Sequence, residues 1–451
     1  MREAIAFGER GRVAAVGSAE GVRRALPTGA EIVHARGAFV CPGFVDPHVH
    51  VRAAASAALA TDVSGERDLV AAVRAATAGR RGWVTLAGAD LRTGGTDRRR
   101  LDEASAGCAV RVRDRSGHAW LFNSRALREL GIEGELPDGV LVERLADRTP
   151  TGFVADHVGW VGARLGRVSG EPEVAAAVRR WSRDLARRGV VAVCDATGTN
   201  GADQTRSLTA WHEDGALLQE MTFLAAPDAR VDDSGRRAGV KFAAAHDPRL
   251  ARALATEARV AVHCIDPSET GTVLRVARDL GPRRRAALRI EHAAFLPEDW
   301  IAQVRAVGAT VVTHPSLIAA RGDEYRADPM LEPHDWLYRL RSWVRGGVPL
   351  AFASDAPFGP TDPLAALRDA ASRRTATGAR IGAAEALAGE PALRALTCVA
   401  ADCAGLGPGG YGRLRAGGPG AAVVLSDDPR RRERLADVQL LATAIGGAVV
   451  D

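Results

Sequence analysis

Short apolar runs alternate with amphipathic stretches from about residue 175 onward. The apolar runs are rich in Val, Leu and Ala, and Arg- and Ala-rich segments with helical spacing follow most of them, such as Glu269–Leu280 and Pro297–Val307. This alternation predicts buried parallel strands that are joined by helices. The predicted strands of this region are Val190–Ala196, Glu220–Leu224, Gly239–Ala244, Arg259–Ile265, Leu288–Ala294, Thr310–His314 and Leu350–Ser354.

An earlier apolar run, Phe44–Val51, follows the turn-forming pair Pro42-Gly43 and predicts one more buried strand, which brings the number to eight. Eight parallel strands with helices between them form a TIM-type barrel, whose functional residues lie at the C-terminal strand ends. We therefore expect an α/β fold in which a (β/α)8 TIM-type barrel occupies residues 41–404.

The two ends of the chain share a different pattern, in which short β-rich runs are separated by glycine turns. Because the ends are alike, we expect residues 1–40 and 405–451 to form one small β-sandwich domain, with the barrel inserted between its two parts. Its predicted strands are Ala4–Phe7, Arg12–Val16, Glu31–Ala35, Ala421–Leu425, Val438–Leu441 and Ala448–Val450.

Residues 52–180 do not continue the barrel pattern. We interpret them as an insertion after the first barrel strand, and we expect this insertion to cap the mouth of the barrel. Its predicted elements are a helix over Glu66–Gly79, strands at Trp83–Ala89 and Ala109–Arg113, and a helix over Ser124–Leu130 with Asn123 or Ser124 as its N-cap.

Composition and charge indicate which partners and which cellular compartment to expect for this protein. The chain of 451 residues is 46% hydrophobic with a formal net charge of +5, and its arginine triplets are scattered, so we expect no nucleic-acid partner. No apolar run reaches the length of a membrane span, and the start lacks the apolar core of a signal peptide, so we expect no membrane partner. The six dispersed cysteines indicate reduced, mostly buried thiols and a cytoplasmic protein.

Lysine is nearly absent from the sequence. Of the 60 Lys and Arg residues only Lys241 is a lysine, and it lies in an apolar stretch that predicts a buried strand. Arginine stays protonated in proteins, whereas a buried lysine can lose its proton and react as an amine. Lys241 could react with carbon dioxide to give a carbamate, which is a two-oxygen metal ligand, or form a Schiff base with a carbonyl substrate. The nearby histidines described next favour the carbamate.

Candidate metal ligands fall at or near the ends of five predicted barrel strands. His48 and His50 end the first strand, and their spacing of two places both side chains on the same face. Imidazole and carboxylate groups suit zinc and similar divalent ions. The shared position at strand ends predicts one metal site that contains His48, His50, Lys241, His263, His292 and Asp355.

The sequence around these residues resembles the amidohydrolase superfamily, and most of all the branch called amidohydrolase family 3, which includes formamide deformylase-like enzymes. The order and spacing of the matching stretches hold over nearly the whole chain, including both β-rich ends. The stretches are Pro42–His50, Ser116–Ala119 with Asn123–Leu127, Gly239–Lys241, Val262-His263, Arg289–Ala293, and Ser354–Pro357 with Asp362–Leu364.

The resemblance implies one or two divalent metal ions, with zinc as the first candidate. His48, His50 and Asp355 would hold one ion, His263 and His292 would hold a second, and a carbamylated Lys241 would bridge them. The metal would lower the pKa of its water to roughly 7, and the resulting hydroxide would attack a carbonyl or amidine carbon. Asp355 would take up a proton and pass it to the leaving amine as a catalytic residue.

Two further histidines could act on the substrate. His118, on a glycine-flanked turn of the insertion, would be a second catalytic residue that acts as an electrophile or positions the substrate; the alternative is a histidine that only bonds its own loop. His314 ends the seventh strand, where the branch usually has glutamine, and could contact the substrate.

We therefore expect a metal-dependent hydrolase that cleaves a non-peptide C–N bond of a small-molecule substrate, such as an amide, formamide or cyclic amide. The same site could instead serve lactone or ester hydrolysis, deamination, or a lyase or cyclisation step in a biosynthetic pathway. A non-catalytic binding protein is disfavoured, because all six ligand positions are filled. Because barrels of this kind often pair, a homodimer is one oligomeric state that we consider.

Overall fold

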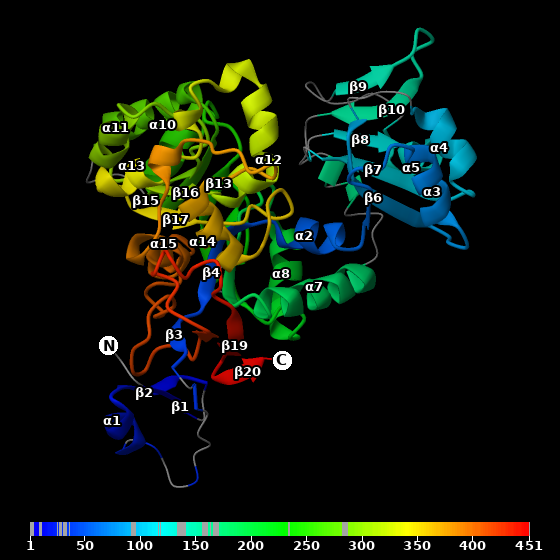
Figure 1. The fold of residues 1–451 in the computed structure, drawn as a ribbon. Coiled ribbons are helices and arrows are strands. Elements are labelled where there is room, and N and C mark those ends of the chain that lie inside the picture. The colour runs from blue at the N-terminus through cyan, green and yellow to red at the C-terminus, as the bar shows by residue number, and fades with distance from the viewer. Residues whose placement is uncertain are drawn as a thin grey trace. The chain divides into compact units, whose positions relative to one another are not determined.

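The computed structural model describes residues 4–8, 11–24, 26, 29, 34–35, 37–91, 96–115, 117, 119–132, 141–155, 161–162, 164–165, 171–232, 235–281 and 287–450. The chain divides into two compact units (Figure 1). One unit combines Met1–Val51 with Arg179–Asp451, and the other is Arg52–Val178. The helices α2 (Val51–Ala57) and α7 (Glu171–Ala186) contain the two points where the chain passes between them.

The larger unit is built on a sheet of eight strands, in the order β4, β11, β12, β13, β14, β15, β16, β17. Each strand pairs in parallel with the next, which confirms the predicted TIM-type barrel. All eight predicted strands are present, with small shifts at their ends: β4 Phe44–Val49, β11 Val190–Asp195, β12 Glu220–Ala225, β13 Arg237–Phe242, β14 Arg259–Cys264, β15 Ala287–His292, β16 Thr310–Thr313 and β17 Leu350–Phe352.

Backbone hydrogen bonds join the end of the sheet to its beginning. The amide of Asp355 donates to the carbonyl of His48 at 2.9 Å, and the amide of His50 donates to the carbonyl of Ala356 at 2.9 Å. The Asp46 carboxylate accepts a further bond from the Ser354 amide at 3.2 Å. The chain that follows β17 is therefore held against the end of β4, which brings Asp355 beside the first two histidines.

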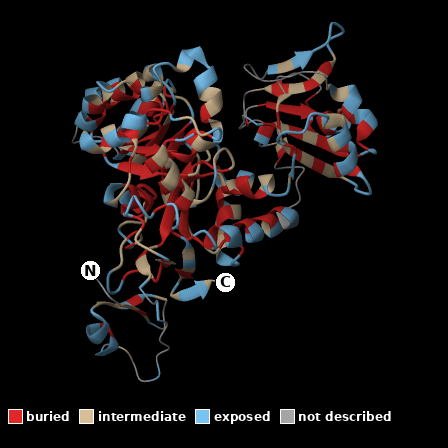
Figure 2. Ribbon diagram, in the orientation of Figure 1, coloured by how far each residue is buried: buried red, intermediate tan, exposed pale blue. Residues whose placement is uncertain are grey.

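Helices surround the barrel strands, and the strands are the most deeply buried part of this unit (Figures 1 and 2). The helix α10 is amphipathic: it buries Val273, Leu274 and Ala277, and the Asp266 side chain caps its first turn. The helices of this unit after α7 are α8 Ala202–Glu213, α9 Leu250–Thr256, α10 Pro267–Leu280, α11 Trp300–Ala306, α12 Ser316–Ala327, α13 Arg341–Arg345, α14 Pro363–Ser372, α15 Glu390–Leu396 and α16 Cys398–Cys403.

The two ends of the chain meet in an additional β domain. The strand β3 (Phe39–Pro42) pairs with β18 (Ala422–Leu425), and β19 (Leu440–Ile445) and β20 (Ala448–Val450) complete a sheet of four strands. A separate hairpin contains β1 (Ala4–Phe7) and β2 (Val13–Gly17), and α1 Ala19–Arg24 follows it. The predicted strand Glu31–Ala35 lies mostly outside the described residues.

The smaller unit has its own sheet and its own core. The sheet has the strand order β5-β6-β7-β8-β10-β9. Successive residues of β8 serve different clusters: Leu121 packs with Leu101, whereas Trp120 and Phe122 pack with Leu127. Its elements are β5 Thr61–Asp62, α3 Leu69–Thr77, β6 Trp83–Ala89, α4 Arg98–Ala104, β7 Ala109–Asp114, β8 Ala119–Phe122, α5 Ser124–Leu130, β9 Leu141–Arg144 and β10 Pro150–Ala155.

The fold is therefore mixed α/β, with a TIM-type barrel and an extra β domain, as the sequence predicts. All six cysteines are buried and free. Among the helices of the described residues, none combines the length and the apolar character needed to cross a membrane.

Candidate metal centre

Four of the predicted ligands converge at the C-terminal ends of barrel strands. His48 lies in β4 and His50 directly follows it, His292 is the last residue of β15, and Asp355 comes shortly after β17. The Asp355 carboxylate lies 3.2 Å from His50 Nε2, 3.4 Å from His48 Nε2 and 3.8 Å from His292 Nδ1. One carboxylate therefore contacts three imidazoles, as the position of the strand ends predicts.

The other two predicted ligands lie next to this group. The ring centre of His263, on β14, is 4.4 Å from that of His292. Lys241, on β13, is only 4% exposed, and its Nζ has no hydrogen-bond partner among the described residues. Its charge lowers the pKa of His48, second only to burial, which places Lys241 near that ring.

The lysine is in an environment that favours its neutral form. Burial lowers the pKa of Lys241, although the Glu291 carboxylate acts in the opposite direction. Lys241 is placed here by a close approach of two strands: a Cβ at Gly239 would lie 2.7 Å from the carbonyl oxygen of Arg259 in β14. Glycine at this position lets β13 pair tightly with β14 two residues before the lysine.

A buried ion pair orients His48. Its Nδ1 is hydrogen-bonded to the carboxylate of Glu291, which in turn accepts a 2.7 Å bond from Arg289 Nε. Arg289 also donates to the carbonyl of Pro47 at 2.9 Å, so the pair is tied to β4 itself. Because a carboxylate only accepts, His48 carries its proton on Nδ1 and directs the lone pair of Nε2 at the ligand group.

Glu291 stays ionised because positively charged side chains lie near its carboxylate. Burial acts to raise the pKa of Glu291, but the Arg289 guanidinium and Lys241 together hold that pKa below the usual value. The stretch Arg289–Ala293 matches the family pattern, but the sequence alone assigned no role to Glu291. The signal was present, since Glu291 directly precedes a predicted ligand on the same strand.

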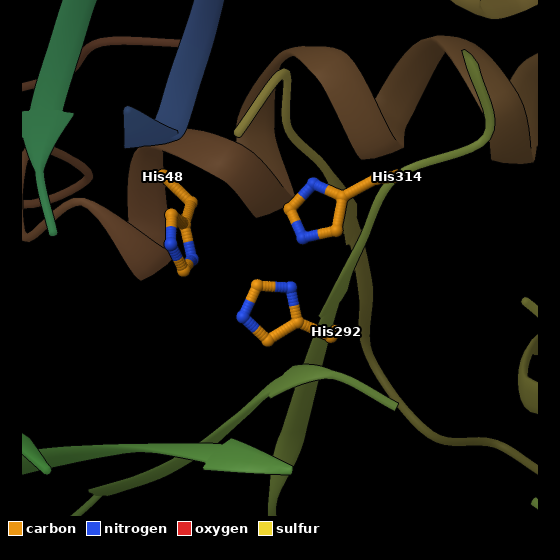
Figure 3. A group of neighbouring side chains, drawn as sticks. All are labelled: His48, His292 and His314. Atoms are coloured by element: carbon orange, nitrogen blue, oxygen red, sulfur yellow. The ribbon is translucent and has the colours of Figure 1, made fainter. Parts of the chain in front are cut away.

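A further histidine belongs to the same group and was not predicted as a ligand. His314 directly follows β16 and is 1% exposed. Figure 3 shows its ring facing those of His48 and His292. Together these three offer ligand atoms that lie within 4.8 Å of one another, as do His48, His50 and Asp355. The rule that located the other candidate ligands, a side chain at a barrel strand end, applies equally to His314.

Two residues of the site have unusual backbone conformations. His292 has φ of 68° and Asp355 has φ of 56°, a left-handed region that non-glycine residues rarely adopt. Each such residue costs about 1–3 kcal/mol, so the surrounding structure must hold it in place. The Thr313 hydroxyl, for example, donates to the carbonyl of His292 at 2.9 Å.

The donor set fits a divalent metal ion. Burial lowers the pKa of His48, His292 and His314, so these rings are neutral near pH 7 and keep a free lone pair. Burial acts to raise the pKa of Asp355, but the interaction with His50 and the neighbouring imidazoles hold it below its usual value. Neutral imidazoles with an ionised carboxylate are typical zinc ligands.

The predicted catalytic residue His118 lies outside the described residues, as does Ser116 of the same motif. The adjoining stretch Asn123–Leu127 is described: Asn123 caps α5 by accepting from the amide of Ala126 at 3.0 Å. This confirms the local helix and its N-cap.

Comparisons with known proteins agree with this fold. A model of the amidohydrolase family matches residues 31–451. The N-substituted formamide deformylase of Arthrobacter pascens is 26% identical over 515 residues, which cover 97% of this chain and 93% of that protein.

Solved structures share the fold over most of the chain. An uncharacterized metal-dependent hydrolase from Pyrococcus horikoshii has a TM-score of 0.76 at 19% identity, covering 94% of this chain and 93% of that one. Atrazine chlorohydrolase from Arthrobacter aurescens, crystallised with zinc, has a TM-score of 0.55 at 14% identity, covering 99% and 89%. Since the family model spans nearly the whole chain, this protein belongs to the amidohydrolase family, the metal-dependent hydrolases that act on carbon–nitrogen bonds.

Proposed function

We propose that this protein hydrolyses a non-peptide C–N bond of a small molecule, and that this bond belongs to an amide, a formamide or a cyclic amide. The observation that carries the proposal is the meeting of three imidazoles at the Asp355 carboxylate. Among these substrates, N-substituted formamides are the first class to test, because the formamide deformylase relative covers nearly the whole chain.

The site would hold one or two divalent ions, with zinc as the first candidate. A carbamylated Lys241 would bridge two ions, which is supported by its burial and by the absence of a hydrogen-bond partner for Nζ in the described part of the chain. A bound ion would supply Lewis-acid activation of water and of the substrate carbonyl. The proposed ligands are His48, His50, Lys241, His263, His292 and Asp355.

The proton transfers would fall to Asp355. As water adds to the carbonyl carbon, the carboxylate would accept the proton that the water loses and deliver it to the leaving nitrogen. The C–N bond then breaks after the C–O bond has formed, and the products are a carboxylic acid and an amine. Glu291 keeps the Nδ1 proton on His48, so that His48 takes no part in these transfers.

The remaining parts of the chain have proposed roles around this reaction. His118 would position the substrate or polarise its carbonyl, and residues 52–180 would form the cap that carries it. Six free, buried cysteines support a cytoplasmic, reducing location.

A product assay tests the proposal. Purified protein is incubated with a panel of N-substituted formamides, simple amides, cyclic amides, lactones and esters, and free amine and acid are measured together. We expect equal amounts of acid and amine from at least one amide class, and loss of that activity in Asp355→Asn. Acid without amine from a lactone or ester, or ammonia from a ring, would instead support the alternative reactions of the same site.

A matched control is His212→Gln. His212 lies on α8 and has an Nδ1 contact to a backbone carbonyl, that of Gln219, at 2.9 Å, but it has no place among the proposed ligands. The activity of His212→Gln should equal that of the wild-type protein.

A further inference from the structure

His314 has one ring nitrogen with no assigned use. Its Nδ1 lies 3.0 Å from the carbonyl oxygen of Ala353, which can only accept, so Nδ1 carries the proton of the neutral ring. Its Nε2 is then a lone-pair acceptor. This atom is buried and has no hydrogen-bond partner among the described residues, and a buried polar atom without a partner needs an explanation.

The same situation occurs in the two rings that face it. His48 uses Nδ1 for Glu291 and directs Nε2 at the group, and the Nε2 of His292 is also buried without a hydrogen-bond partner in the described chain. Histidines that bind a metal almost always donate their other ring N–H to a carboxylate or a carbonyl. His48 donates in this way to a carboxylate, and His314 donates to a carbonyl.

We propose that His314 is a metal ligand, and that His48, His292 and His314 hold one divalent ion between them. This proposal rests on the proposed metal-dependent function but regroups its ligands, because His292 then serves the same ion as His48. Asp355, at 3.4 Å from His48 Nε2, would border this ion. Three imidazoles with an open fourth position are one of the known arrangements of catalytic zinc.

The spacing of the rings agrees with a shared ion. A zinc–nitrogen distance of about 2.0–2.1 Å, with the ring centre about 1.1 Å behind the nitrogen, puts tetrahedrally arranged ring centres about 5.2 Å apart. The observed separations are 5.0 Å for His48 and His292, 4.8 Å for His292 and His314, and 5.4 Å for His48 and His314. Figure 3 shows the three rings arranged around one point from three different segments.

The other role considered for His314 is a contact to substrate, and the tautomer of the ring limits which contact it can make. A neutral ring that donates from Nδ1 cannot also donate from Nε2, so His314 cannot polarise a substrate carbonyl by a hydrogen bond. It could accept from a substrate N–H, and this role is separated from the metal role by experiment.

The experiment measures metal binding without relying on turnover. Wild-type protein, His314→Ala, His314→Asn and the control His212→Gln are stripped, loaded with zinc alone and compared by competition with a chromogenic chelator. Asn keeps a donor for the Ala353 carbonyl, so this variant covers the case in which Ala does not fold. We expect both His314 variants to lose zinc affinity by more than the roughly 10–100-fold that follows loss of an outer hydrogen-bond partner. His212→Gln should bind as the wild-type protein does.

X-ray absorption of the zinc-loaded proteins provides a second readout. If two ions are bound, the first equivalent is examined alone. The number of imidazoles around zinc should fall by one in a folded His314 variant and stay unchanged in His212→Gln.

Unchanged zinc affinity and an unchanged imidazole number in the His314 variants would overturn the proposal. A raised KM with normal zinc binding would overturn it in favour of the substrate contact, while the proposed hydrolase function would stand. Absence of zinc binding in the wild-type protein would contradict both.

Discussion

Three imidazoles of the site use Nδ1 outside the ligand group and keep Nε2 for it. His48 Nδ1 bonds Glu291, His314 Nδ1 bonds the Ala353 carbonyl, and His50 Nδ1 lies 3.0 Å from the Thr197 hydroxyl. The nitrogen that faces the group is in each case set by what the other nitrogen contacts. The chemistry of the site thus depends on residues that would never touch a metal.

The convergence of the candidate ligands was predictable from the sequence, but their hydrogen-bond partners were not. A side chain at the end of a barrel strand can be placed from strand order alone, which located His48, His50, His292 and Asp355. Glu291 is 243 residues away from His48 in sequence, so only the folded barrel shows that the two meet. For the same reason the orphaned Nε2 of His314 could not be foreseen.

Lys241 gives a prediction at this scale. Lys241→Arg and Lys241→Gln should both lose metal and activity, because neither side chain can form a carbamate. The Lys241→Gln variant covers the case in which the buried guanidinium of Lys241→Arg prevents folding. Carbon-13 NMR of wild-type protein prepared with labelled bicarbonate should show a carbamate carbon that is missing in both variants. Either variant having normal metal content and activity would contradict the carbamate role.

Glu291 gives a second prediction. In Glu291→Gln, Arg289 is left as a buried charge without its carboxylate, which should lower the free energy of unfolding by about 3–5 kcal/mol. The His48 tautomer also loses its support, so zinc affinity should fall by about 10–100-fold. Urea unfolding and chelator competition measure the two effects separately.

The control for Glu291 is Glu257→Gln. Glu257 pairs with Arg237 at 3.0 Å, but both side chains are about 30% exposed, at 31% and 29%. Loss of a pair that water can reach should cost about 1 kcal/mol or less. Similar losses in the two variants would show that the Glu291 pair does not depend on burial.

The elements were predicted best where apolar runs are continuous. The barrel strands are buried on both faces, so each appears as an uninterrupted apolar stretch such as Val190–Asp195. In the smaller unit, β8 and β10 were not predicted, because β8 has only the four residues Ala119–Phe122 and β10 alternates buried with half-buried positions. Their pairing partners, not their own composition, define them.

The approach of β13 to β14 gives a prediction at the element scale. In Gly239→Ala the added Cβ would lie 2.7 Å from the Arg259 carbonyl oxygen, so the strands must separate. We expect a loss of about 1–3 kcal/mol in unfolding free energy, together with lower metal content because Lys241 moves with the strand. At Gly17 in β2 an added Cβ meets no atom within 4 Å, so Gly17→Ala should change unfolding by about 0.5 kcal/mol or less. Normal metal content in folded Gly239→Ala would show that the position of Lys241 does not depend on the close approach of β13 to β14.

At the scale of the whole molecule, the site draws on strands from distant parts of the sequence. His48 comes from the first barrel strand and Asp355 from the chain after the last, and hydrogen bonds between these segments close the barrel. An ion held by both would bind the folded chain and not the unfolded one, and would therefore stabilise the closed barrel. The two ends of the chain are joined by the pairing of β3 with β18, and β3 was not among the strands predicted for the N-terminal part.

This coupling predicts that removal of metal lowers thermal stability. Free zinc at 100 times its dissociation constant stabilises the folded state by about 2.7 kcal/mol, so stripped protein should unfold at a lower temperature. Re-addition of zinc should restore the Tm, and magnesium at the same concentration should restore it less, because imidazole ligands favour zinc. A Tm that is the same with and without zinc would argue against a site that links these strands.

The most direct measurement is the metal content of the purified protein, determined by mass spectrometry of its elements together with amide hydrolysis before and after chelation. We predict roughly one to two divalent ions per chain, loss of hydrolysis when they are removed, and recovery when zinc is returned. A protein that contains no metal and keeps full activity after chelation would contradict the assignment of these histidines, Lys241 and Asp355 to a metal centre.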